Sequence, residues 1–247
     1  MKKAALLIVV AFALAACEVK IAETPDPDSA PARPGYDLTT TEAYDLGAMA
    51  SYGGNHDAIY DYIDARLPAH LAAIQRWLRQ PSISAQDIGI DEMAALLRQD
   101  LEDLDFAEAE LVPTDGHPGV WGYYDAGAEQ TLVVYLMYDV QPVNPEDWLS
   151  PPFAAELVDH DLGRVLMARG ATNQKGPQRA FLNALESIVA VEGKLPINIM
   201  VAAEGEEELG SPHYSQIIDA YEDRLKQADA VLFPFNSQTP DGKINMI

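Results

Sequence analysis

Apolar positions along the chain recur with the period of an α-helix in four segments. Over residues 57–79 they follow steps of three or four residues, at Ile59, Ile63, Leu67, Leu71, Ile74 and Leu78. Pro68 interrupts this pattern and leaves two alternatives: one kinked helix, or a second helix that carries Pro68 in its first turn. Further helices are predicted over about 90–104, over 177–192 with Pro177 in the first turn, and in the segment SQIIDAYEDRLKQ.

Short apolar runs between these helices predict β-strands. The run TLVVYLMY at 131–138 is almost continuously apolar, as is typical of a central buried strand, and LPINIMVAAE at 195–204 has the same character. Further strands are predicted in AEAELVP, GVWGYYD, VLMARG and DAVLFPF. Because strands alternate with helices, the sequence predicts an α/β fold, a three-layer sandwich around a mixed, largely parallel central sheet.

The first 54 residues lack these patterns and are interpreted as a leader and a tether. Lys2 and Lys3 precede an apolar run that is too short to span a bilayer, so residues 1–17 predict a secretory signal peptide. Residues 18–54 are rich in Pro, Asp, Ala and Ser without an apolar period, which predicts a disordered tether. Residues 55–247 are then the folded part.

The end of the leader resembles a bacterial lipobox, Leu14-Ala15-Ala16-Cys17. The resemblance implies cleavage before Cys17, lipidation of that residue, and a protein anchored by acyl chains on the periplasmic side of a membrane. Glu18 favours the outer membrane. The alternative is an ordinary signal peptide with an incidental cysteine, and since Cys17 is the only cysteine, no internal disulfide can form.

The charge of the chain argues against one class of partner. The formal net charge is −23, from 16 basic and 39 acidic residues. Such a chain repels nucleic acid, so we expect no nucleic-acid binding.

Acidic residues gather where two of the predicted strands end. Asp139 follows the strand at 131–138, and the run EGEEELGS follows the strand at 195–204 with Glu204, Glu206, Glu207 and Glu208. Ligands of open α/β sheets bind at the carboxyl ends of the strands. A carboxylate cluster there can hold divalent cations, and a free glutamate can act as a general base on water. The alternative is a solvated helix start, which glutamates also favour.

Four motifs in one order carry a family resemblance: YDVQPV (138–143), Trp148 with PPF (151–153), RGA with KG (169–171 and 175–176), and EGEEELGS (204–211). They resemble the zinc peptidases and deacylases that include carnosine dipeptidases, carboxypeptidase G, acetylornithine deacetylase and succinyl-diaminopimelate desuccinylase. The resemblance runs from about Asp57 onward and favours the dipeptidase branch. It implies a zinc-exopeptidase-like catalytic domain that hydrolyses small peptides or N-acyl amino acids. Because the chain ends at Ile247, we expect this domain to be incomplete, without the lid domain through which the family forms homodimers.

The resemblance also assigns roles, one position at a time. Glu207 falls on the family's general base and Glu208 on a zinc ligand, while Asp139 falls on the aspartate that orients a ligand histidine. The position of that histidine is Met137, and the position of the aspartate that bridges the two metals is Asn173. A thioether suits Zn²⁺ poorly, and a neutral amide offsets less of the repulsion between two dications. The next acidic ligand should fall at Phe235 or Asn236, so we expect a zinc site reduced to one ion or none.

Two functions remain open at this point. The first is a metallopeptidase-type hydrolase with Glu207 and Asp139 as catalytic residues and an altered metal site. The alternative is a non-catalytic lipoprotein that binds a peptide or amino-acid derivative in the same cleft. A third hypothesis assigns no function and takes the chain as an inactive fragment. Arg169 and Lys175 are candidates for binding an anionic substrate, or they pair with the surrounding acids. The five histidines are not expected to be ligands, and His213 is interpreted as a helix-start residue.

Overall fold

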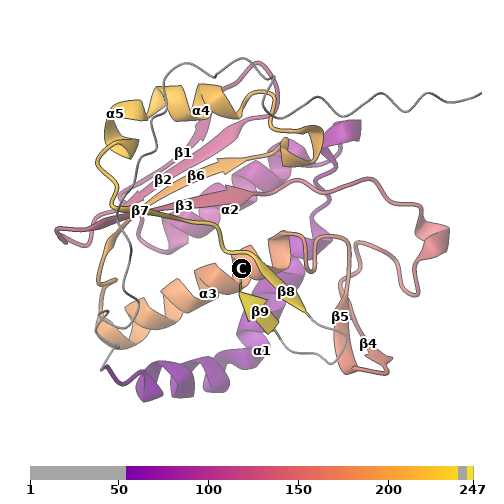
Figure 1. The fold of residues 1–247 in the computed structure, drawn as a ribbon. Coiled ribbons are helices and arrows are strands. Elements are labelled where there is room, and N and C mark those ends of the chain that lie inside the picture. The colour runs from indigo at the N-terminus through magenta and orange to yellow at the C-terminus, as the bar shows by residue number, and fades with distance from the viewer. Residues whose placement is uncertain (1–53, 239–243, 247) are drawn as a thin grey trace, which may run out of the picture. The chain divides into compact units, whose positions relative to one another are not determined.

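A mixed five-stranded sheet forms the centre of the fold in a computed structural model, which describes residues 54–238 and 244–246 (Figure 1). Its strands lie in the order β1 (Glu108–Val112), β2 (Gly119–Tyr124), β6 (Asn198–Glu204), β3 (Thr131–Met137) and β7 (Ala230–Leu232). β2 is antiparallel to both β1 and β6, whereas β3 is parallel to both β6 and β7. Four strands therefore run in one direction and β2 alone runs in the other, which confirms the predicted mixed, largely parallel sheet.

Helices cover both faces of this sheet (Figure 1). On one face lie α1 (Asp57–Arg79), α2 (Ile90–Asp103) and α3 (Lys175–Glu192), and on the other lie α4 (Tyr214–Ala220) and α5 (Glu222–Leu225). The alternation of side chains along β3 supplies both cores, because Val134 and Leu136 pack with α2 and α3 while Val133 packs with Ile217 of α4. The three-layer sandwich is thereby confirmed.

The structure decides between one helix and two helices around Pro68. α1 is one continuous helix with Pro68 inside it, on an exposed face, so the two-helix interpretation is wrong. The placement of Leu67 on the inward face is also wrong, since Leu67 is 59% exposed. α1 packs along α3, and its buried residues are Ile59, His70, Trp77 and Leu78, a narrower stripe than the sequence period suggests.

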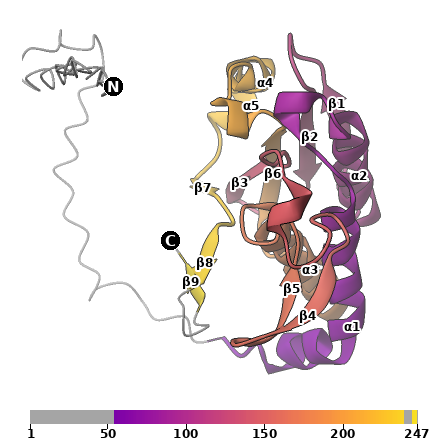
Figure 2. The ribbon, with the colours of Figure 1, turned by 90° about the vertical axis from the view of Figure 1, so that its right-hand side faces the viewer.

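Two hairpins and three short 3₁₀ helices complete the described chain. β4 (Glu156–His160) and β5 (Gly163–Met167) form one hairpin, and β8 (Asn236–Gln238) and β9 (Ile244–Met246) form the other. The 3₁₀ helices are η2 (Ser84–Gln86), η3 (Pro145–Asp147) and η4 (Glu207–Leu209). Figure 2 shows the β4–β5 hairpin beside α1, where the Gln75 side chain donates to the Ala155 carbonyl at 2.8 Å.

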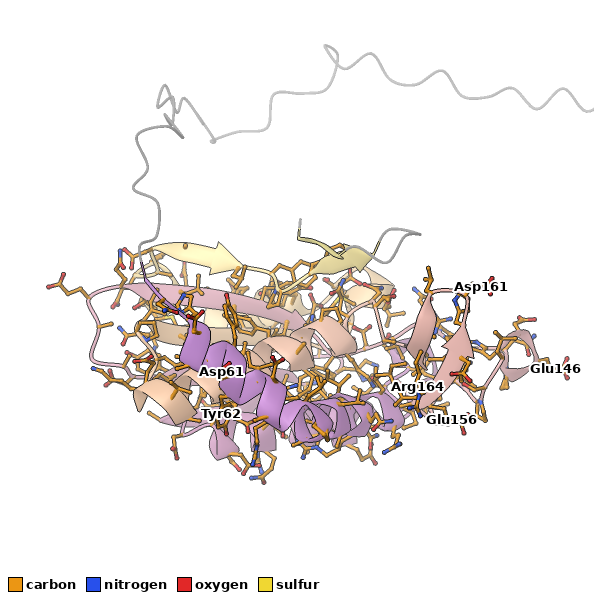
Figure 3. All side chains as sticks on the ribbon, turned by 90° about the horizontal axis from the view of Figure 1, so that it is seen from below. Asp61, Tyr62, Glu146, Glu156, Asp161 and Arg164 are labelled. Carbon is orange, nitrogen blue, oxygen red and sulfur yellow. The ribbon has the colours of Figure 1, made fainter. Side chains whose placement is uncertain are left out.

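The charged residues of this hairpin lie at one end of the molecule. Figure 3 shows Glu156, Asp161 and Arg164 there together with Glu146 of η3, far from Asp61 on α1. None of the described helices is long and apolar enough to cross a membrane. The predictions for residues 1–17, for the tether at 18–54 and for Cys17 concern residues outside the described ranges, apart from Gly54.

Candidate active site

The candidate site is built where the parallel strands β3 and β6 end side by side. Met137 is in register with Glu204, and the Tyr138 amide donates to the Glu204 carbonyl at 2.9 Å. The two acidic motifs therefore meet at the carboxyl ends of β3 and β6, as the sequence predicts. This is the usual location of sites in open α/β sheets.

Asp139 holds the two motifs together. Its buried carboxylate accepts hydrogen bonds from the Ser84 hydroxyl at 2.7 Å and from the backbone N–H groups of Glu207 at 3.2 Å and Glu208 at 3.0 Å. Burial raises the pKa of Asp139, although the Ser84 hydroxyl and the Glu208 N–H act in the opposite direction. The structure thus gives Asp139 a positioning role at the start of η4.

Glu208 is fixed by two amide side chains. The Asn173 amide donates to Oε1 at 3.0 Å and the Gln141 amide donates to Oε2 at 2.6 Å. Glu207, by contrast, is half-buried, and its carboxylate accepts no hydrogen bond from the side chains and backbone groups that the structure describes. Burial raises the pKa of Glu207, and the charges of Glu208 and Asp139 raise it further. Glu207 is therefore the carboxylate free to accept a proton at this site.

The residues at the expected metal-ligand positions do not fit a pair of zinc ions. Met137 is 1% exposed, and its thioether replaces the imidazole that zinc prefers. Asn173 turns its amide nitrogen toward Glu208 and accepts a hydrogen bond from Gln174 at 2.8 Å on its oxygen, so both ends of the amide are engaged. The third position is Phe235 or Asn236, and Phe235 offers only a hydrocarbon ring, whose centre lies 5.7 Å from that of Phe233.

The described residues also offer no alternative metal site. Within the described part of the chain, no three His, Cys, Asp or Glu side chains are arranged to hold a metal ion. The expectation of a reduced zinc site stays a prediction, and the donor set at Met137, Asn173 and Phe235 favours it.

The two candidate substrate-binding cations have different environments. Lys175 has no exposed surface, and its ammonium donates to the Gln80 carbonyl at 2.5 Å and to the Ser82 hydroxyl at 3.1 Å. The buried ammonium of Lys175 is therefore not available to bind a substrate. Arg169 is half-buried, donates to the Pro142 carbonyl at 3.3 Å and lies 5.2 Å above the Trp148 ring, so of the two only Arg169 has a partly accessible side chain.

Burial of Lys175 predicts a pH dependence of stability. Burial lowers the pKa of Lys175 from 10.5 to about 7, although Asp139 opposes the shift. Between these two values the unfolded chain binds more protons than the folded chain, so stability rises with pH and the cost of burial is greatest below about pH 7. Urea unfolding should show a rise of about 1 kcal/mol per pH unit between pH 7 and 9. Lys175→Met should lose this slope and Lys194→Met should keep it, while an equal slope in both variants would rule out Lys175 as its source.

Several residues of the site were not singled out from the sequence. Gln141 lies in YDVQPV and Ser84 in the loop after α1, and both reach the site only through the tertiary fold. Glu206 pairs with His213 at 2.7 Å. His213 directly precedes α4, which confirms its interpretation as a helix-start residue. The signal for Gln141 was its place in the family motif YDVQPV, whereas Ser84 had only its position in the loop after the first predicted helix.

The comparisons with known proteins agree with the fold and the motifs. Residues 135–245 match the model of Peptidase family M20/M25/M40. The chain is 29% identical over 178 residues to a Cys-Gly metallodipeptidase, DUG1, from Candida albicans, a match that covers 65% of this chain and 36% of the relative.

Two solved structures share the fold. The M20 family metallo-carboxypeptidase Sso-CP2 from Sulfolobus solfataricus has a TM-score of 0.62 at 35% identity and is matched over 70% of this chain and 39% of its own. Human carnosine dipeptidase 1 has a TM-score of 0.64 at 26% identity, with coverage of 72% and 40%. The chain thus spans about two fifths of the length of these proteins. The stretch at residues 135–245 therefore belongs to peptidase family M20/M25/M40, in agreement with the zinc peptidases and deacylases that the sequence motifs resemble.

Proposed function

We propose that the protein is a hydrolase that cleaves the amide bond of short peptides or N-acyl amino acids at the Glu207 site. Family membership supports this proposal, as do the names of the matched proteins, which are dipeptidases and a carboxypeptidase. The observation that carries it is the Glu207 carboxylate, which accepts no hydrogen bond from the described residues, on a backbone whose N–H donates to Asp139 at 3.2 Å.

The residues of this chain divide the work in the proposed reaction. Glu207 takes a proton from the attacking water and returns it to the leaving amine, a role that its raised pKa favours. Asp139 positions Glu207 and Glu208 through their backbone amides. Arg169 is the candidate partner for a carboxylate of the substrate. The family's zinc has no fitting set of donors here, so no part of this assignment depends on it.

One observation favours a second function, binding without cleavage. Both oxygens of Glu208 are engaged by the amides of Gln141 and Asn173, where the family uses a metal. Because Asn173 and Glu208, which stand at ligand positions of the family, bond to each other, the site can keep its shape without metal ions. It would then lack the ions that polarise the carbonyl of a substrate. The protein would then hold a peptide or amino-acid derivative and release it unchanged.

Turnover by the full-length chain separates the two functions. A panel of dipeptides and N-acetyl amino acids should be hydrolysed, and Glu207→Gln should lower the rate by at least about 100-fold, which is the usual contribution of a general base. Glu129→Gln is the matched control, because it makes the same change in an exposed loop at the opposite end of β3. Metal content is measured in the same samples. No turnover by any preparation would leave the binding function, and equal rates for both variants would exclude Glu207 as the base.

A further inference from the structure

The last residues of β3 lose one of the two strands that pair with it. β7 pairs with β3 only from Leu132 to Val134, whose partner is Leu232, whereas β6 stays beside β3 as far as Met137. The Tyr138 N–H donates to β6, and successive N–H groups along a strand point in opposite directions. The N–H and C=O of Met137 therefore point away from β6, toward the side that β7 leaves after Leu232.

A side chain of α3 takes the place of the missing strand. Gln178 has no exposed surface, and its amide faces the backbone of Met137. With the amide oriented as these neighbours require, its nitrogen donates to the Met137 carbonyl at 2.7 Å and its oxygen accepts from the Met137 N–H at 3.1 Å. One amide thus completes both hydrogen bonds that a neighbouring strand would supply. Since Met137 is 1% exposed, water has little access to either backbone group.

The peptide unit that Gln178 holds leads directly to Asp139. Its C=O accepts from Gln178, and its N–H, that of Tyr138, donates to β6 at 2.9 Å. α3 and β6 therefore fix this peptide from two sides. The Asp139 carboxylate accepts from the backbone N–H groups of Glu207 and Glu208. The orientation of the peptide thus determines how Asp139 leaves β3 and where the two glutamates are held.

We propose that Gln178 is a positioning residue of the candidate site, which holds the end of β3 so that Asp139 can place the backbone of Glu207. Gln178 supplies no atom to the reaction, because both ends of its amide are engaged by Met137. Its effect on catalysis rests on the proposed function, whereas its hold on the strand end does not. The two are measured separately.

Hydrogen exchange of single backbone amides in the full-length chain tests the hold on the strand end. Gln178→Met keeps the length of the side chain but removes both bonds to Met137. The Met137 amide and the two glutamate amides on Asp139 should then exchange at least about 10-fold faster. Gln75→Met is the matched control, since Gln75 also donates to a backbone carbonyl, at 2.8 Å just before β4, and it should leave these amides unchanged. Unchanged exchange of the two glutamate amides in folded Gln178→Met would overturn the proposal.

A general loss of stability is distinguished from this local effect. The amides of β2, which pairs with β1 and β6 but not with β3, report on the whole fold, and only exchange that rises more than theirs supports the proposal. Gln178→Asn, one methylene shorter, is used if circular dichroism shows Gln178→Met to be unfolded. In the unmodified chain the Met137 amide should exchange as slowly as the paired amides of β3. Exchange as fast as that of Glu129, in an exposed loop, would overturn the proposal without any variant.

Turnover tests the role of Gln178 in the reaction. With a dipeptide that the unmodified chain cleaves, Gln178→Met should lower kcat about 10-fold or more and change KM less than about 2-fold, because a displaced base weakens the transition state more than substrate binding. Gln75→Met should keep both constants. Unchanged kcat in Gln178→Met would overturn the proposal. No turnover by the unmodified chain would remove the proposed hydrolysis alone, and the exchange of the glutamate amides would then decide.

Discussion

Asp100→Asn is expected to lower the free energy of unfolding by about 3–5 kcal/mol, because it removes one partner from a buried ion pair and leaves the other charge uncompensated. Asp100 lies on α2 and is 3% exposed. Its carboxylate accepts from the Trp77 indole at 2.6 Å, lies 3.1 Å from Arg179 Nε and also contacts Arg76. These contacts join α1, α2 and α3 on the face of the sheet away from α4.

Arg179 decides the size of this effect. Arg76 is partly exposed and can return to water, whereas the Arg179 side chain is buried and its pKa is lowered by burial, with Asp100 as the main group that opposes the shift. An asparagine keeps the volume and one acceptor but supplies no charge. The guanidinium of Arg179 would then stay buried with the Asn183 side chain as a neutral acceptor, and only the smaller charge effects of Glu186 and Asp103 would offset it. A buried charge that has lost its main partner is the situation that makes such substitutions costly.

Urea unfolding followed by tryptophan fluorescence and by circular dichroism measures the change in the free energy of unfolding. Glu102→Gln is the control on the same helix, because its pair with Arg98 is 3.5 Å long and exposed on both sides, and such pairs contribute less than about 1 kcal/mol. If Asp100→Asn and Glu102→Gln destabilise equally, the buried pair does not carry the stability assigned to it.

The parts of the fold that the sequence predicted best are those whose burial is complete. β3 and β6 are covered by helices on both faces, so nearly every position must be apolar, and each appears in the sequence as a continuous run. The run DAVLFPF gave a poorer prediction, since β7 covers only Ala230–Leu232 and is the outermost strand of the described sheet, next to β3. An outer strand is less buried, so fewer of its positions must be apolar and its hydrophobic pattern in the sequence is weaker.

In the site, too, the positions of some residues follow from the local sequence, whereas other contacts depend on long-range packing. Asp139 and Glu207 each stand just after a buried strand, and parallel pairing of those strands suffices to bring them together. The bonds of Glu208 to Gln141 and Asn173 cross 67 and 35 residues of sequence and depend on side-chain directions that no periodicity encodes. The sequence could show that the ligand positions were changed, but not that the new side chains would bond to the old ligand.

Asn173→Asp is expected to destabilise the fold and to leave it without tightly bound zinc. The substitution replaces an N–H donor, now 3.0 Å from Glu208, with a second carboxylate. The chain then loses a hydrogen bond to a charged group and gains a like-charge contact, a combined cost on the order of 1–3 kcal/mol at pH 7. Asn173→Ala isolates the two effects, because it loses the hydrogen bond without adding the charge, and it should be the more stable of the two variants.

Zinc does not rescue this variant because the other ligand positions remain unsuitable. Met137 still offers a buried thioether, and the third position is the hydrocarbon ring of Phe235 or the neutral amide of Asn236. An ion between the new carboxylate and Glu208 would therefore have two carboxylates but neither the imidazole nor the third acid of a zinc site. Metal analysis after gel filtration and thermal unfolding with added zinc measure the outcome for Asn173→Asp and for the double variant with Met137→His, which should bind zinc more tightly. One zinc per chain retained by Asn173→Asp alone would show that the lost acid at position 173, rather than a change spread over three positions, is what separates this site from a zinc site.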